Sequence, residues 1–409
     1  MAKNRELIAG LDIGTSKTCC VLADISGGAI DIVGLGSHAS HGLRKGVVVN
    51  IESTVESIKA AVEEAETMAG AEIESVYASV AGEHIKGINS HGIIAVKGSE
   101  VTQADVDRVL EAAKAVNIPM DREMIHTLSQ EFIVDEQGGV AKPVGMRGVR
   151  LEAKVHIITG SVTWIQNIVR SVNRAGLVVS ATVAEQLAAS EAALDEDEKE
   201  LGVALVNMGG GTCDIAIYHK GSIKWTSVVT LGGNDITGDI SIGFRTPGHE
   251  AEKIKRLYGC AASDLVPDDE VIDVPGVGER EARQVYRRTL ADIIQPRVEE
   301  IFMMVKRDLE VSGYLDQLAA GLALTGGTAM MQGMPEIAEA IFNMPVRRAH
   351  PRKLGGITDI VDSAEYATAV GLILYGARDM ASGRKRRSRG KGALDGGLVK
   401  IKDWIKDFF

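Results

Sequence analysis

Three glycine-containing segments carry the residue types that hold phosphate groups. They begin at Gly14, Gly209 and Gly326, and each continues into hydroxyl side chains. Glycine lets backbone N–H groups approach an anion closely. Asp12, just before the first segment, is placed to hold Mg²⁺ through its water shell, and Lys17 is long enough to reach phosphate oxygens. A single segment of this kind is as often a plain tight turn as a phosphate-binding loop. Three of them in one chain are hard to obtain by chance.

The elements that must position these segments repeat along the chain. Each half contains three strand-like runs joined by glycine turns. The runs are 7–12, 18–23 and 29–35 in the first half and 203–207, 213–218 and 222–229 in the second. Asp12 and Asn207 then hold equivalent places at the ends of the first strands, which indicates an internal duplication. A further apolar run at 321–324 precedes the third glycine segment, which is expected to open a helix.

Helices are expected to cover these sheets. Residues 51–68 repeat apolar side chains at helical spacing, and residues 364–380 form the last helix of the second half. The stretch 83–161 interrupts the repeated plan with strands at 92–96, 132–134 and 153–158 and a helix that opens at Thr102, with Asp105 three residues on. We interpret this stretch as an inserted α+β subdomain.

The three segments together resemble the phosphate-1, phosphate-2 and adenosine motifs of the actin, Hsp70 and sugar-kinase superfamily. The resemblance implies an α/β fold, the duplicated actin-like (ribonuclease H-like) two-lobed architecture, with ATP and Mg²⁺ as cofactors. The implied nucleotide-binding residues are Gly14, Thr15, Ser16, Lys17, Gly209, Gly210, Gly211, Thr212, Gly232, Gly233, Glu252, Lys255, Gly326, Gly327 and Thr328.

Two features bear on hydrolysis. The segment 183–189 resembles the first connecting helix of that superfamily, whose acidic or glutamine side chain positions the attacking water, and Glu185 is the candidate for that role beside Asp12. The phosphate-2 strand of the superfamily usually ends in aspartate, and here it ends in Asn207. Binding should survive this change because backbone amides hold the phosphates, so we expect at most a slow ATPase.

The insert, the segments 239–247 and 251–255 and the stretch 292–302 resemble the FtsA family of bacterial cell-division proteins, over nearly the whole chain. The resemblance implies a 1C subdomain in place of 1B, filaments of the chain itself on the inner face of the membrane, and a grip on the C-terminal tail of FtsZ. It also implies contacts with later division proteins such as FtsN. Arg280, Arg283, Arg287 and Arg288, on or near one helix of subdomain 2B, could meet an acidic partner tail.

The implied division of the chain follows from the same resemblance. Subdomain 1A comprises 1–82 and 162–196, 1C comprises 83–161, 2A comprises 197–228 and 303–381, and 2B comprises 229–302. Residues 382–397 read as a flexible basic linker, and residues 398–409 as an amphipathic membrane-targeting helix.

The last twelve residues carry the expectation of a membrane contact. On a helix, one face would hold Leu398, Ile401, Trp404, Ile405, Phe408 and Phe409 within an arc of about 140°. A core-docking helix would show the same stripe. The basic linker, the terminal position and the interfacial aromatics favour an anionic lipid surface.

Composition and charge argue against some classes of protein function. The net charge of −11 argues against a general nucleic-acid binder, and the four cysteines lack metal-ligand spacing. No signal core or spanning segment is evident, so we expect a protein made and kept in the cytoplasm. The resemblance to the FtsA family implies a peripheral place at the cytoplasmic face of the bacterial inner membrane, at the division septum. A sugar or acid kinase would use the same loops but has no need of the tail. Another actin-like scaffold, such as PilM or MreB, stays open as an alternative.

Overall fold

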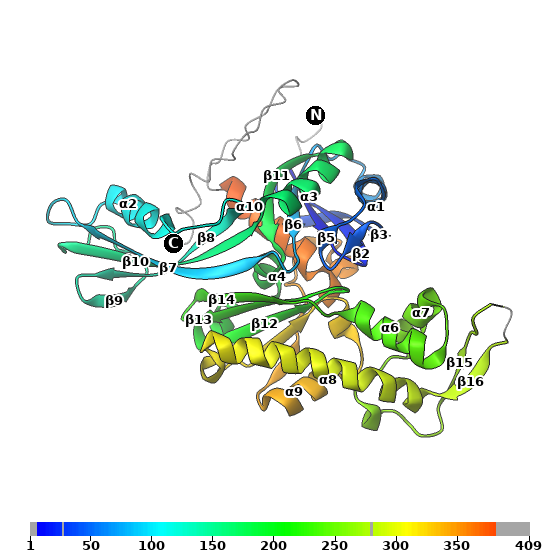
Figure 1. The fold of residues 1–409 in the computed structure, drawn as a ribbon. Coiled ribbons are helices and arrows are strands. Elements are labelled where there is room, and N and C mark those ends of the chain that lie inside the picture. The colour runs from blue at the N-terminus through cyan, green and yellow to red at the C-terminus, as the bar shows by residue number, and fades with distance from the viewer. Residues whose placement is uncertain (1–5, 27, 279–280, 382–409) are drawn as a thin grey trace.

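The computed structural model describes residues 6–26, 28–278 and 281–381, which form two lobes and an inserted subdomain (Figure 1). Each lobe is built on a mixed sheet whose first strands form a meander. The first sheet has the order β11-β6-β1-β2-β3-β19, and the second has the order β14-β13-β12-β17-β18. The predicted two-lobed α/β architecture is confirmed.

The strands of the first sheet are β1 (Leu7–Ile13), β2 (Lys17–Asp24), β3 (Asp31–Ala39), β6 (Ser75–Val80), β11 (Val178–Ala184) and β19 (Gly355–Gly356). A separate small hairpin joins β4 (Leu43–Arg44) and β5 (Val47–Val48). The strands of the second sheet are β12 (Val203–Met208), β13 (Cys213–His219), β14 (Ser222–Val229), β17 (Leu322–Thr325) and β18 (Val346–Arg348).

Helices pack on both faces of the first sheet. The helices here are α1 (Ile51–Ala69), α3 (Val162–Arg174), α4 (Glu185–Ala193) and α10 (Ala367–Ala381), whereas the short α5 (Glu196–Leu201) lies against β13 of the second sheet. A Cβ on Gly36 of β3 would lie 1.8 Å from the carbonyl oxygen of Ala61 in α1, and one on Gly10 of β1 would lie 2.7 Å from that of Ala369 in α10. Glycine on these strands therefore lets each helix backbone lie directly on the sheet.

The last helix packs on the first lobe, whereas the predicted division of the chain had it on the second. Residues 303–381 were expected in the second lobe, but β19 pairs with β3, and α10 packs against β1 and α4. A 3₁₀ turn, η5 (Ala364–Tyr366), precedes α10, so the expected helix at 364–380 begins as a tighter turn. Burying the apolar side chains of α10 against the first sheet explains the crossing, which alternation along the sequence does not reveal.

The insert is a sheet of order β7-β10-β8-β9 covered by one helix. Its elements are β7 (Lys86–Ala95), β8 (Arg122–Val134), β9 (Gln137–Val140), β10 (Arg150–Ser161) and α2 (Gln103–Lys114). Thr102 caps α2 with the predicted partner, Asp105, in a reciprocal capping box. The strands run longer than predicted because their outer ends are polar and are extended by pairing alone, as in Lys86 opposite Thr159.

The second lobe is spanned by the long helix α8 (Arg287–Ser312), which packs its buried face under the sheet (Figure 1). The rest of this lobe contains α6 (Gly233–Phe244), α7 (Gly248–Tyr258), α9 (Met334–Phe342) and a hairpin of β15 (Val271–Val274) and β16 (Arg283–Tyr286). Short 3₁₀ turns complete it: η1 (Ser263–Leu265), η2 (Leu315–Gln317) and η3 (Thr328–Met330). A further one, η4 (Thr358–Val361), follows β19 and packs on β3 of the first lobe. The hairpin was missed because its strands are short and half exposed.

Candidate functional site

The first glycine segment is a tight turn between β1 and β2. The N–H of Gly14 donates to the carbonyl oxygen of Lys17 at 3.0 Å, which closes the turn. The hydroxyl of Thr15 accepts from the N–H of Gly46 at 2.9 Å, and the hydroxyl of Ser16 donates to Oδ1 of Asn234 on α6 at 3.0 Å. The turn is therefore anchored within the first lobe and touches the second.

The second glycine segment faces the first turn directly. A Cβ on Gly210 would lie 1.9 Å from Oγ of Ser16, and a Cβ on Gly211 would lie 2.8 Å from Oγ1 of Thr15. A side chain at position 210 would displace the hydroxyl of Ser16, and one at position 211 would also meet the backbone of Lys45, whose Cα lies 2.9 Å from the Cβ position. The two predicted phosphate loops are thus brought together, and glycine is required at their meeting point.

The third segment completes the group of loops. The hydroxyl of Thr328 donates to the carbonyl oxygen of Gly209 at 2.9 Å, and the N–H of Gly326, at a φ of 88°, donates to the carbonyl oxygen of Ala364 at 3.0 Å. The segment enters the 3₁₀ turn η3 and not the expected α-helix. Met331 adopts an extended conformation, with a φ of −60° and a ψ of 141°, so the turn ends after three residues.

The predicted nucleoside-flanking residues lie beside these loops. The N–H of Gly233 donates to the carbonyl oxygen of Gly209 at 3.0 Å. Nζ of Lys255 donates to the carbonyl oxygen of Gly233 at 2.8 Å and pairs with Glu252 at 2.7 Å. Burial lowers the pKa of Lys255, and Glu252 opposes that effect. Lys255 thereby joins α7 to the start of α6, next to Gly232.

Three carboxyl groups are buried where the two lobes meet. Asp12 accepts from Oγ of Ser79 at 2.8 Å, Glu185 accepts from Nδ2 of Asn207 at 2.8 Å, and Asp214 accepts from Oγ1 of Thr212 at 2.9 Å. Burial raises the pKa of all three, that of Asp214 to about 7. Repulsion from Asp12 adds to the pKa shifts of Glu185 and Asp214, whereas Ser79 and Lys17 oppose the shift of Asp12. Burial therefore favours the protonated forms of these acidic groups beneath the glycine loops.

Asp214 is a member of this cluster that the motif analysis did not single out. Asn207 of β12 and Asp214 of β13 are directly paired, as Asp12 of β1 and Cys19 of β2 are in the first lobe. The second lobe therefore carries its carboxylate on the second strand of the pair instead of the first. The available signal was an acidic residue two positions after Thr212 on a strand that otherwise reads as wholly apolar.

One carboxyl group of this cluster has an oxygen atom that could accept a hydrogen bond from water. Oδ1 of Asp214 is buried without a hydrogen-bond partner among the described residues, so it has an unused acceptor for a water molecule. Within the described ranges, no group of three or more His, Cys, Asp or Glu side chains is arranged to hold a metal. Oδ1 of Asp214, unpaired among the described residues, fits a site that holds water, and the role of Asp12 toward Mg²⁺ stays a prediction.

Three of the four predicted arginines lie on a strand and on the helix that follows it. Arg283 lies on β16 and donates to the carbonyl oxygen of Phe244, while Arg287 and Arg288 open α8. Arg287 pairs with Glu270 at 2.8 Å, and Arg288 pairs with Asp268. Arg283 therefore lies near the helix, on the strand that ends at Tyr286, and Arg287 and Arg288 lie on it, while their contact with a partner tail stays a prediction. Arg280 lies outside the described residues.

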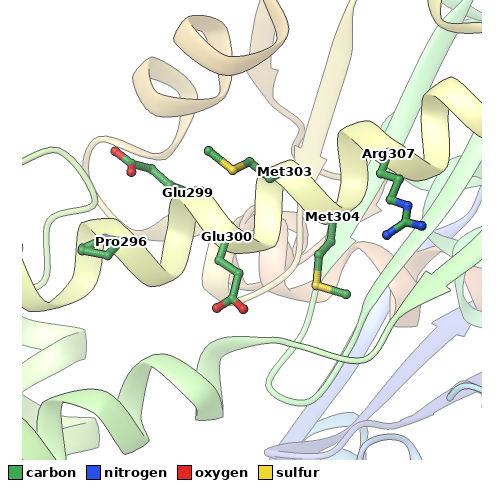
Figure 2. Close-up of a pocket in the computed structure, with 6 residues that line it drawn as sticks. All are labelled: Pro296, Glu299, Glu300, Met303, Met304 and Arg307. Atoms are coloured by element: carbon green, nitrogen blue, oxygen red, sulfur yellow. The ribbon is translucent and has the colours of Figure 1, made fainter.

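A shallow cavity lies elsewhere in the second lobe, along α8. Its volume is about 370 Å³, and Figure 2 shows the lining side chains projecting from this one helix. They are Pro296, Glu299, Glu300, Met303, Met304 and Arg307. The cavity shares no residue with the glycine loops.

The predicted linker and membrane-targeting residues, 382–409, lie outside the described residues. That range contains Leu398, Ile401, Trp404, Ile405, Phe408 and Phe409. Among the helices that the structure does describe, none combines the length and the apolar character needed to cross a bilayer.

Duplicated sheets with facing glycine loops define an actin-like protein. The fold resembles the PilM-PilN type IV pilus biogenesis complex, with a TM-score of 0.65 and 16% identity, over 90% of this chain and 98% of the matched one. It also resembles MreB5 of Spiroplasma citri bound to ADP, with a TM-score of 0.54 and 15% identity, over 92% and 99% of the two chains.

Sequence comparison places the chain within this class. The family model described as cell division protein FtsA matches residues 204–371, and that of the SHS2 domain inserted in FtsA matches residues 82–159. The cell division protein FtsA of Pseudomonas aeruginosa is 47% identical over 99% of this chain and 98% of its own length. That of Escherichia coli K12 is 39% identical over 100% and 99%. The chain belongs to the FtsA family of cell division proteins.

Proposed function

We propose that this chain is an ATP-binding division protein that polymerises on the inner face of the cytoplasmic membrane and anchors the FtsZ ring there. The observation that carries the proposal is the meeting of the two phosphate loops, in which Ser16 stands where a side chain on Gly210 would be. Two loops that approach so closely can surround a polyphosphate with backbone N–H groups from both lobes. Nucleotide binding would then fix the angle between the lobes, which sets the surface offered to the next subunit.

Each part of the nucleotide has candidate partners. The loops 14–17 and 209–212 would hold the phosphates, with Lys17 supplying a positive charge. The segment 326–328 would support the adenosine, with Glu252 accepting from ribose hydroxyls and Lys255 flanking the base. The solved structures of S. citri MreB5 with ADP and with AMPPNP, the latter at a TM-score of 0.51, support a nucleotide in a chain of this fold.

Hydrolysis is expected to be slow at best. When bound, Mg²⁺ would neutralise phosphate charge, with Asp12 acting on it through water. Glu185 is the candidate to orient the attacking water, and its bond from Asn207 fixes the carboxylate in place. Burial raises the pKa of Glu185, which favours its protonated form and so reduces its use as a base near neutral pH.

Membrane attachment is proposed from the sequence of residues 398–409. One short amphipathic segment binds lipid weakly and reversibly. Arg384, Lys385, Arg386, Arg387, Arg389 and Lys391 would add attraction to anionic headgroups. A filament would multiply these contacts, because each subunit brings its own anchor at high effective concentration.

The partners proposed for the protein body are the FtsZ tail, other copies of the chain and division proteins such as FtsN. Membership of the FtsA family supports a role among division partners in general. An acidic FtsZ tail would have to compete with Glu270 for Arg287 and with Asp268 for Arg288. We therefore expect weak binding that falls steeply with added salt.

The alternative functions are less well supported. The likeness to PilM at 16% identity indicates the fold alone, whereas the curated FtsA relatives share 39% to 47% identity over nearly the full chain. A sugar or acid kinase would have no need of the amphipathic segment 398–409.

A liposome recruitment assay tests the proposal as a whole. A labelled peptide of the FtsZ C-terminal tail should sediment with anionic vesicles only when both this protein and MgATP are present. Trp404→Glu should abolish vesicle binding while peptide binding in solution is kept, and Val399→Glu, off the apolar stripe, should leave both intact. Vesicle binding by Trp404→Glu would refute the anchor, and failure to bind the peptide would refute the FtsZ assignment.

A further inference from the structure

Lys17 of the first phosphate loop forms an ion pair with Glu365, which is distant from it in the sequence. Its Nζ lies 2.9 Å from Oε2 of Glu365 and 3.4 Å from the carbonyl oxygen of the same residue. The ammonium group also lies 3.9 Å from the ring centroid of Tyr366. Glu365 and Tyr366 therefore surround the ammonium group that contacts nucleotide phosphate in the proposed function.

Glu365 belongs to η5, which is fastened to the third glycine segment. The N–H of Gly326 and the hydroxyl of Thr325 both donate to the carbonyl oxygen of Ala364 at 3.0 Å. A Cβ on Gly327 would lie 3.9 Å from Cβ of Glu365. The ion pair thus joins the phosphate-1 loop to the adenosine loop, across the place where a nucleotide would bridge them.

We propose that Glu365 competes with nucleotide phosphate for Lys17, so that the ion pair sets the affinity of the site. The inference rests on the proposed nucleotide binding. A carboxylate offers Lys17 one negative charge, whereas a di- or triphosphate offers several, so phosphate is the stronger partner. The side chains of Lys17 and Glu365 are 25% and 28% exposed, and a pair this open to water is weak enough to be exchanged.

The pair has further consequences for how the site discriminates. A ligand without phosphate gains nothing from Lys17 and leaves the ion pair in place. A ligand with phosphates must break the pair, so its affinity is lowered by the free energy that the pair contributes. Glu365 should therefore affect nucleotides but not the nucleoside, and only while Lys17 is present.

Calorimetric titration of four variants tests the competition. The full chain, Glu365→Gln, Lys17→Gln and the double variant are each titrated with MgATP, MgADP and adenosine. We expect Glu365→Gln to bind MgATP and MgADP about two- to fivefold more tightly, the range for a partly exposed pair, with adenosine unchanged. In the Lys17→Gln background the same substitution should change nothing. Glu310→Gln, which removes an exposed carboxylate from α8, is the matched control.

The outcomes separate this inference from the proposed function. Unchanged or weaker MgATP binding by Glu365→Gln, an equal gain for adenosine, or the same gain without Lys17 would each overturn the competition while nucleotide binding stands. If the unaltered chain binds none of the nucleotides, both fall together. Equal melting temperatures of all variants exclude misfolding as the cause, as expected for two partly exposed side chains.

Discussion

The side-chain amide of Asn207 donates a hydrogen bond to the carboxylate of Glu185, with 2.8 Å between Nδ2 and Oε1. Both side chains are buried, at 3% and 9% exposure, and the contact joins the end of β12 to the first residue of α4. An aspartate at position 207 has no N–H to donate. Asn207 and Glu185 are therefore matched, and the asparagine spares Glu185 a third carboxylate neighbour beside Asp12 and Asp214.

Asn207→Asp is expected to destabilise the nucleotide-free protein. The change replaces the amide donor with a second acidic group beside Glu185, so that one of the two must stay protonated or the two repel each other, which costs about 1–3 kcal/mol. Urea unfolding at neutral pH measures the loss, with the exposed Asn117→Asp as control. MgATP should restore more stability to Asn207→Asp than to the unaltered chain, because a cation relieves the added charge. Unchanged unfolding of the variant would contradict the pairing.

Asp214 should make the nucleotide-free protein less stable as the pH rises. Its pKa is about 7 in the folded state against an ordinary 3.8, so the folded chain binds the extra proton between these values and loses that advantage as the pH increases. Asp214→Asn should remove roughly 1–4 kcal/mol of this decline, at about 1.4 kcal/mol per pKa unit. Urea unfolding at a series of pH values between the two pKa values tests this. The control Asp316→Asn removes an exposed carboxylate and should keep the full dependence of unfolding free energy on pH. If the unfolding free energy of Asp214→Asn falls with pH as steeply as that of the unaltered chain, Asp214 is not the group responsible.

His156 should contribute the opposite pH dependence. Its ring nitrogens contact Oδ1 of Asn89 at 2.7 Å and Oγ1 of Thr226 at 2.9 Å, linking the insert to β14. Burial lowers the pKa of His156 to about 4 from 6.5, so stability is lost as the pH falls through this window. His156→Leu should cost about 1–3 kcal/mol at neutral pH and remove that acid loss.

The comparison for this variant is His249→Leu, whose side chain is 73% exposed. The free energy of unfolding of His249→Leu should stay within about 0.5 kcal/mol of that of the unaltered chain. Equal effects of the two substitutions would mean that the contact between the insert and β14 adds nothing to stability.

The packing of α10 on α4 is testable through one glycine. A Cβ on Gly371 would lie 1.7 Å from the carbonyl oxygen of Ala188, so Gly371→Ala must push the two helices apart. We expect a loss of about 3 kcal/mol and weaker nucleotide binding, since α4 begins at Glu185. Gly238→Ala, in open space on α6, should gain about 0.5–1 kcal/mol. Thermal unfolding of both variants decides the point, and equal behaviour would argue against close packing.

The glycine loops and the strands around them were predictable because each is a local pattern. Gly14, Gly209 and Gly326 sit at strand ends where apolar runs stop, and turn chemistry is set within a few residues. The α1 helix is also local, and its apolar spacing predicted its extent to within one residue. Asp214 escaped notice because the charge is unusual only once β13 is known to be buried on both faces.

The sequence by itself determined the duplicated strands, the three loops and the family, since these depend on residue type and short-range order. Only the tertiary structure decided that α10 returns to the first lobe, that Asn207 meets Glu185 and that Glu365 reaches Lys17. These contacts join residues far apart in the chain, and they form because burial of apolar faces brings the two lobes and the crossing segment together. Long-range packing of this kind leaves no periodic pattern along the sequence.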